Sequence, residues 1–125
     1  MDRKNLTTEA IALLKQLIAI PRTSRDETAA ADLLERYMTA HCSLPTSRVC
    51  NNVWTVAPAY DEARPTLLLN AHIDTVKPVG GWTYDPHTPT LEGDTLYGLG
   101  ANDDGASLVS RLQVFRALRD EERPY

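Results

Sequence analysis

The chain has 125 residues, enough for one domain with a buried core. Hydrophobic residues make up 42% and charged residues 24%, values typical of a soluble globular protein. The net charge of -4, with 13 scattered lysines and arginines, argues against a nucleic-acid-binding surface.

The apolar segments and the N-terminus carry no membrane or export signal. The segment Ile11–Ile20 is too short to cross a bilayer and contains a lysine and a glutamine. Residues 1–5 lack the charged, apolar and small-residue pattern of a signal peptide. We therefore expect a cytoplasmic protein without a membrane partner, in which Cys42 and Cys50 are free thiols.

Two helices are predicted near the N-terminus. Residues 7–20 place apolar side chains on two adjacent helical faces, with Thr7 or Thr8 as the N-cap, and Pro21 ends that helix. The segment Ser24–Glu27 has the pattern of a capping box, which predicts a second helix that begins after Ser24 and ends near His41.

Strands are predicted in the middle of the chain. Residues 48–50 and 53–57 read as two short strands joined by a tight turn at Asn51-Asn52. The continuous apolar run 66–71 is typical of a strand buried on both faces of a sheet. A long loop with three prolines follows at 77–89, and residues 90–97 predict a hairpin around Gly93-Asp94.

A third helix is predicted from about Asp104 to Arg119. It places one apolar stripe on a single face, formed by Leu108, Leu112, Phe115 and Leu118. The predicted fold class is therefore α/β, with helices packed on a mixed β-sheet.

His72 and Asp74 follow the apolar run 66–71 and have the pattern of a metal site. Residues i and i+2 of a strand point to the same side, so the two side chains are expected to lie together. A neutral histidine can bind a metal through one ring nitrogen while a carboxylate accepts the N–H of the other. The alternative is a histidine that is simply hydrogen-bonded at a strand end.

Asp103 follows Gly98-Leu99-Gly100 and precedes the third predicted helix. The two glycines allow a sharp turn into a site, but they lack the third glycine of a nucleotide-binding loop. A carboxylate at this place can bridge two cations through its two oxygens. The alternative role for Asp103 is that of a helix N-cap.

These segments resemble the two N-terminal signatures of a dinuclear-zinc metallopeptidase family. The family contains acetylornithine deacetylase, succinyl-diaminopimelate desuccinylase, aminoacylase and glutamate carboxypeptidase. The similarity is carried by five segments: Pro21–Ser24, Asn51–Trp54, His72–Val76, Gly81–Pro86 and Leu96–Asp103. The closest resemblance is to the acetylornithine deacetylase branch. Within that branch, the segment Asn102–Ser107 resembles the corresponding segment of one subgroup. Most of the family has Lys-Gly where this chain has Gly105-Ala106.

The resemblance implies a role for three residues. His72 would bind one zinc ion, Asp103 would bridge two, and Asp74 would orient His72 as a catalytic residue. Cobalt can substitute for zinc in such sites. The resemblance also implies a cis peptide bond between Asp103 and Asp104.

The resemblance further implies that residues 1–125 are the N-terminal portion of an incomplete zinc-peptidase catalytic domain. The general base and second ligand of the family are a Glu-Glu pair on a strand after the third helix. Asp120-Glu121-Glu122 lies at a helix end, which is the wrong position, and neither His41 nor His87 matches a family ligand. The lid domain, through which the full-length parent would form a homodimer, is also expected to be absent. The third helix and the central strand would then lose neighbours, and we expect them to leave apolar surface exposed.

The implied activity is zinc-dependent hydrolysis of a small-molecule N-acyl amino acid such as N-acetylornithine, with the 125-residue chain inactive alone. The alternatives are a desuccinylase or dipeptidase of the same family, or a non-catalytic fragment that acts as an interaction module.

Overall fold

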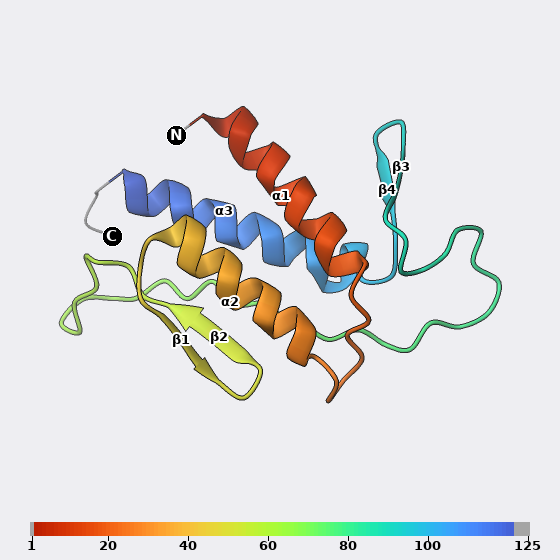
Figure 1. Cartoon of the computed structure of the whole chain (residues 1–125). Helices are drawn as coiled ribbons and strands as arrows, with labels where there is room; N and C mark the ends of the chain where they lie inside the picture. The colour runs from red at the N-terminus through yellow and green to blue at the C-terminus, as the bar shows by residue number, and fades with distance from the viewer. Residues whose placement is uncertain (1, 122–125) are drawn as a thin grey trace.

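The computed structural model describes residues 2–121. Within them lie three α-helices, one π-helical turn and two hairpins, in the order α1 (Arg3–Ile18), α2 (Thr28–Cys42), β1 (Thr46–Val49), β2 (Asn52–Thr55), β3 (Thr90–Glu92), β4 (Thr95–Tyr97), η1 (Ala101–Ala106) and α3 (Ser107–Asp120). The predicted α/β class is confirmed, and within residues 2–121 two small antiparallel sheets take the place of the single mixed sheet that the sequence predicts. Figure 1 shows the three helices side by side, with the β1–β2 hairpin against α2 and the β3–β4 hairpin projecting beyond the C-terminal end of α1.

Helix α1 begins before its predicted start. Asp2 is the N-cap, and its carboxylate accepts a hydrogen bond from the backbone N–H of Lys4 at 3.0 Å. The predicted caps Thr7 and Thr8 are wrong, because both lie inside the helix and donate to carbonyls one turn earlier. The helix ends at Ile18, just before the predicted stop.

The predicted capping box of α2 is also wrong. The N-cap is Glu27, which makes no side-chain capping bond. Its carboxylate instead accepts the backbone N–H of Arg25 at 2.8 Å. The Ser24 hydroxyl donates to Asp74, so a long-range partner has replaced the local one. The predicted end of α2 near His41 is confirmed, since the helix ends at Cys42.

The two hairpins form close to their predicted positions. In β1–β2, Val49 pairs with Asn52, so the turn lies one residue before the predicted one. In β3–β4, Glu92 pairs with Thr95, and the predicted turn residue Gly93 adopts φ 59°. Both ladders are antiparallel and two-stranded.

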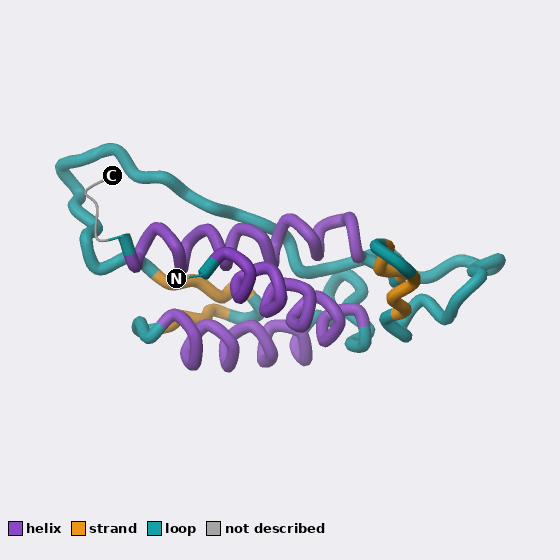
Figure 2. The backbone as a smooth tube through the Cα atoms, turned by 90° about the horizontal axis from the view of Figure 1, so that it is seen from above, coloured by secondary structure: helices purple, strands orange, loops and turns teal. Residues whose placement is uncertain are grey.

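The predicted strand at 66–71 does not form. Within residues 2–121 each hairpin strand pairs only with its own partner, so no strand lies beside this segment to supply its hydrogen bonds. Figure 2 shows the chain between the two hairpins as a long loop beside the helices. The side chains of Leu67 and Leu68 are 67% and 79% exposed, as expected for an apolar run without neighbours.

The core lies between the three helices. Buried aliphatic side chains come from all of them: Leu13, Leu14, Leu17 and Ile18 from α1, Ala30, Leu33 and Leu34 from α2, and Leu108 and Val109 from α3. The buried face of α3 differs from the predicted apolar stripe. Gln113 and Arg116 are buried, whereas the predicted Leu112, Phe115 and Leu118 are only half-buried. Arg116 is buried because it pairs with Glu9 of α1 and donates to Tyr37 of α2.

Within residues 2–121, none of the helices is long and apolar enough to cross a membrane.

Candidate metal site

The site is built from two loop segments that flank the helix layer. His72 and Asp74 lie in the extended segment before Thr75, whose N–H donates to the carbonyl of Arg22 at 2.8 Å. Asp103 lies in η1, where its φ/ψ of -109°/97° interrupts the helical geometry. Gly100 precedes it in the left-handed region at φ 76°. These backbone features bring the two predicted halves of the site together.

The His72 imidazole connects the two segments. Its Nε2 lies 2.9 Å from Oδ1 of Asp103, so the predicted convergence of these residues is observed. Its Nδ1 lies 3.1 Å from both Oδ1 and the backbone O of Asp74. With the Nδ1–H donated to Asp74, Nε2 faces the Asp103 carboxylate: in the imidazolium it donates a proton to that carboxylate, and in the neutral ring its lone pair is free for a cation bound beside Asp103.

Electrostatics favour charge on both members of the His72–Asp74 pair. Desolvation disfavours the imidazolium, but the hydrogen bonds to Asp103 and Asp74 outweigh it and raise the pKa of His72. The hydrogen bond from Ser24 lowers the pKa of Asp74, with desolvation opposing it and the charge of His72 adding to it. Asp74 is therefore a carboxylate at neutral pH, the form that can hold the Nδ1–H of His72.

Ser24 is a site residue that the sequence interpretation misses. The capping-box pattern assigns it to a helix cap, whereas its hydroxyl donates to Oδ2 of Asp74. This bond leaves Oδ1 of Asp74 directed at His72. The signal available in the sequence is its place in Pro21–Ser24, one of the segments that carry the family resemblance.

The peptide bond between Asp103 and Asp104 is cis, as the resemblance implied. The Asp104 carboxylate is directed to α3, where it pairs with Arg111 at 3.3 Å. Desolvation of Asp104 is outweighed by hydrogen bonds from Ser107 and the His72 backbone and by the charge of Arg111, so its pKa is lowered. The two residues joined by the cis peptide bond therefore have different partners: Asp103 contacts His72, and Asp104 contacts Arg111 of α3.

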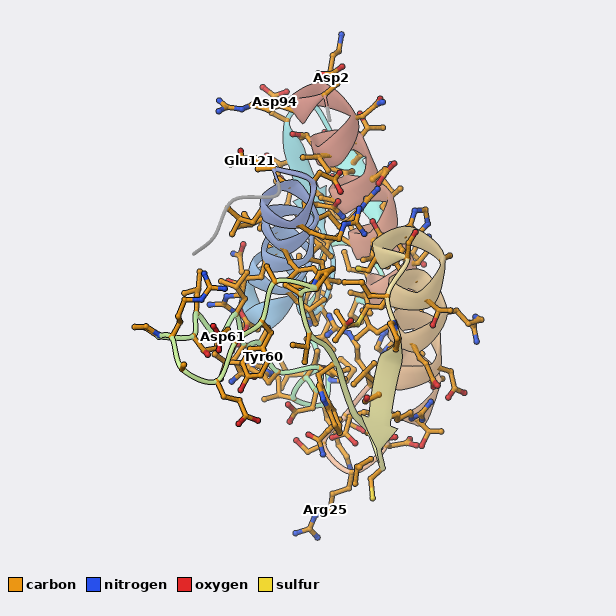
Figure 3. The ribbon with its side chains drawn as sticks, turned by 90° about the vertical axis from the view of Figure 1, so that its left-hand side faces the viewer. Asp2, Arg25, Tyr60, Asp61, Asp94 and Glu121 are labelled. Atoms are coloured by element: carbon orange, nitrogen blue, oxygen red, sulfur yellow. The ribbon has the colours of Figure 1, made fainter. Side chains whose placement is uncertain are left out.

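The residues that the sequence argues against as ligands lie elsewhere. His41 stacks on Tyr37 of α2 with ring centroids 4.3 Å apart, and the His87 backbone N–H is bonded to Asp85 within the long loop. Asp120 pairs with its neighbour Arg119 at the C-terminal end of α3, where Figure 3 labels Glu121. That end is roughly 20 Å along the helix from η1. Glu122 lies outside the described residues.

The donors fit zinc in kind. A histidine nitrogen and a carboxylate oxygen are common zinc ligands, and two ligands of a tetrahedral centre lie about 3.3 Å apart, close to the 2.9 Å between Nε2 of His72 and Oδ1 of Asp103. The Asp103 side chain is 90% exposed, which leaves its second oxygen accessible. Among residues 2–121, no group of three or more His, Cys, Asp or Glu side chains is placed to hold a metal ion. The described residues therefore supply fewer ligands than the three that a catalytic zinc usually has.

Comparisons with known proteins find relatives of the segments that form this site. Residues 68–125, which contain all three predicted site residues, match the model of peptidase family M20/M25/M40. A succinyl-diaminopimelate desuccinylase from Variovorax paradoxus is 32% identical over 129 residues, covering 93% of this chain and 33% of that protein. Proteins of the same name from Acidovorax ebreus and Blochmanniella floridana are 32% and 26% identical, covering 90% of this chain and 33% and 31% of theirs.

The chain therefore belongs to peptidase family M20/M25/M40, and the class of activity found in this family is hydrolysis. It spans about a third of the length of the curated relatives that it matches. The similarity covers nearly the whole chain, which agrees with a partial peptidase domain. These relatives carry the desuccinylase name, so the predicted closeness to the acetylornithine deacetylase branch is not shown by them.

Proposed function

We propose that this chain supplies part of the metal site of a zinc-dependent amidohydrolase that acts on an N-acyl amino acid. The observation that carries the proposal is the contact between Nε2 of His72 and Oδ1 of Asp103 at 2.9 Å, with Asp74 on the other ring nitrogen. A metal-binding histidine held by a carboxylate is the usual arrangement in zinc sites.

Each of the three residues has a distinct task. His72 provides the Nε2 lone pair as a ligand, and the Asp103 carboxylate provides oxygens that can reach two ions. Asp74 holds the Nδ1–H of His72 and so fixes the tautomer that a ligand needs. Bound zinc, or cobalt in its place, supplies polarisation of the amide carbonyl and activation of water. A glutamate outside this chain would accept the proton of that water.

Two acyl groups are candidates for the substrate. The name of the relatives favours a succinyl group, since proteins called succinyl-diaminopimelate desuccinylase match 90–93% of this chain in three cases. The resemblance of Asn102–Ser107 to a deacetylase subgroup favours an acetyl group. The first candidate has the stronger support, because it rests on similarity along nearly the whole chain. Dimerisation through a further domain is also part of the proposal.

Metal content and turnover test this function together. The protein, produced at the full length that its gene encodes, would be assayed with N-succinyl-diaminopimelate and N-acetylornithine in the presence of Zn²⁺ or Co²⁺. We expect His72→Ala and Asp103→Ala to lose bound metal and turnover. His87→Ala is the matched control, because this histidine lies in the long loop, and it should retain both.

Three results would separate the alternatives. A higher kcat/KM for one substrate assigns the acyl group. Metal binding unchanged in both His72→Ala and Asp103→Ala would overturn the assigned ligands. A protein that binds no metal and cleaves neither substrate would instead support a non-catalytic interaction module.

A further inference from the structure

Arg22 is a buried cation that joins the two halves of the candidate site. Its side chain is among the largest that are fully buried, with 1% exposure. One guanidinium nitrogen, Nη1, donates to the carbonyl of Ile73, and the other, Nη2, donates to the carbonyl of Gly100 at 3.2 Å. Ile73 lies between His72 and Asp74, and Gly100 lies at the start of the turn that carries Asp103.

The surroundings of the Arg22 guanidinium consist of backbone carbonyls, with no carboxylate in direct contact among the described residues. Burying a cation costs free energy unless it is paired, and burial lowers the pKa of Arg22. The charge of Asp74 opposes this effect, but no carboxylate among the described residues forms an ion pair with Arg22 within 4.0 Å. Its Nε is also buried without a hydrogen-bond partner in the part of the chain that the structure describes. Two backbone carbonyls are therefore what this buried charge binds.

The planar fork of the guanidinium suits this task. Its two terminal nitrogens bond carbonyls from segments 51 and 78 positions away in the chain, which a single-point donor cannot reach together. The backbone is shaped to admit it: a Cβ on Gly100 would lie 2.6 Å from Nη2 of Arg22. The close approach of Arg22 thus requires glycine at position 100.

We propose that Arg22 is a positioning residue that sets the separation of His72 and Asp103 by bonding the backbone beside each of them. The inference rests on the proposed metal site and assigns to it a residue outside its ligand set. It predicts that Arg22 affects metal affinity, while a buried arginine elsewhere in the helix layer does not.

The test uses the full-length protein and Co²⁺, with the dissociation constant measured by chelator competition and the ligand geometry followed by visible absorption. We expect Arg22→Met to weaken Co²⁺ binding about 10- to 100-fold and to shift the absorption bands, as loss of supporting contacts does in other sites. Arg22→Lys keeps the charge but reaches only one of the two carbonyls. Its affinity for Co²⁺ should therefore lie between those of the unmodified protein and Arg22→Met. Arg116→Met is the matched control, because Arg116 is also buried but contacts Glu9 of α1 and Tyr37 of α2, away from the candidate site, and it should stay within about twofold of the unmodified protein.

The outcomes are distinguishable. Unchanged Co²⁺ binding in a folded Arg22→Met protein, or equal weakening in Arg22→Met and Arg116→Met, would overturn the positioning role while leaving the metal site intact. If Arg22→Met does not fold, the Co²⁺ affinity of Arg22→Lys is used instead. An affinity within twofold of that of the unmodified protein would then overturn the positioning role. An unmodified protein that binds Co²⁺ no better than His72→Ala would overturn the proposed function and this inference with it.

Discussion

Nε2 of His72 lies 2.9 Å from Oδ1 of Asp103, although 31 positions separate the two residues in the chain. Neither residue belongs to an α-helix or a strand, so regular hydrogen-bonding does not position them. Their places are set by contacts between loops: Ser24 with Asp74, Thr75 with the carbonyl of Arg22, and the turn at Gly100. Tertiary contacts around the backbone therefore position the candidate ligands.

The hydrogen bond between Asp74 and His72 should support metal affinity. Asp74→Asn replaces the carboxylate by an amide that holds the Nδ1–H less strongly, so we expect Zn²⁺ affinity to fall by about 10- to 100-fold. The measurement is competition with a chelator in the full-length protein. Asp85→Asn is the control, because Asp85 accepts a backbone N–H within its own loop. Equal affinities in the two variants would show that Asp74 does not act through His72.

The 125-residue chain alone should not turn over an N-acyl amino acid. Its described residues supply two candidate ligands that converge, and a catalytic zinc usually has three protein ligands. The assay is amine release from N-succinyl-diaminopimelate and N-acetylornithine with excess Zn²⁺ or Co²⁺. Turnover that Asp103→Ala abolishes would contradict this prediction and would direct attention to the acidic residues at the end of α3.

Gly105 should be intolerant of a side chain. A Cβ at this position would lie 2.4 Å from the carbonyl oxygen of Gly100 and 2.6 Å from Cδ1 of Leu14. Since one of these atoms belongs to the backbone, relief requires movement of η1, and we expect Gly105→Ala to lower the free energy of unfolding by about 1–3 kcal/mol. Gly80→Ala is the matched control, because a Cβ on Gly80 would have nothing within 4 Å. Urea unfolding followed by circular dichroism compares them, and equal midpoints would argue against the close packing of η1.

The two free cysteines should differ in reactivity. Cys42 is fully buried and Cys50 is exposed. Burial raises the pKa of the Cys42 thiol, with nearby Arg119 and Arg116 opposing it, so the thiolate that reacts is disfavoured there. Iodoacetamide at pH 8 should therefore modify Cys50 first, as read by mass spectrometry of the peptides. Faster labelling of Cys42 under native conditions would mean that the end of α2 opens readily.

Much of the fold follows from local sequence patterns. The three helices appear where a 3.6-residue apolar period predicts them, and the β3–β4 turn falls on Gly93-Asp94 as predicted. The helix N-termini are predicted less well. The serine and threonines that could cap a helix use their hydroxyls differently, because Ser24 bonds Asp74 and Thr7 lies within α1.

The run 66–71 shows the limit of such patterns. Its apolar side chains predict a central strand, but a strand forms only beside another, and within residues 2–121 the hairpin strands are already paired with each other. The difference in the buried face of α3 has a similar cause. Gln113 and Arg116 are buried because partners on two other helices, Tyr37 and Glu9, satisfy them.

The sequence by itself determined the candidate residues and the family: His72, Asp74 and Asp103 stand in short motifs whose residue types suit a metal, and these motifs indicated the family. The tertiary structure alone decided how they meet. Arg22 and Ser24 act on partners 50 to 78 positions away, and a pattern of neighbours in the chain holds no information about such contacts. A hydrogen bond depends on distance in space, and folding brings distant positions to within about 3 Å of each other.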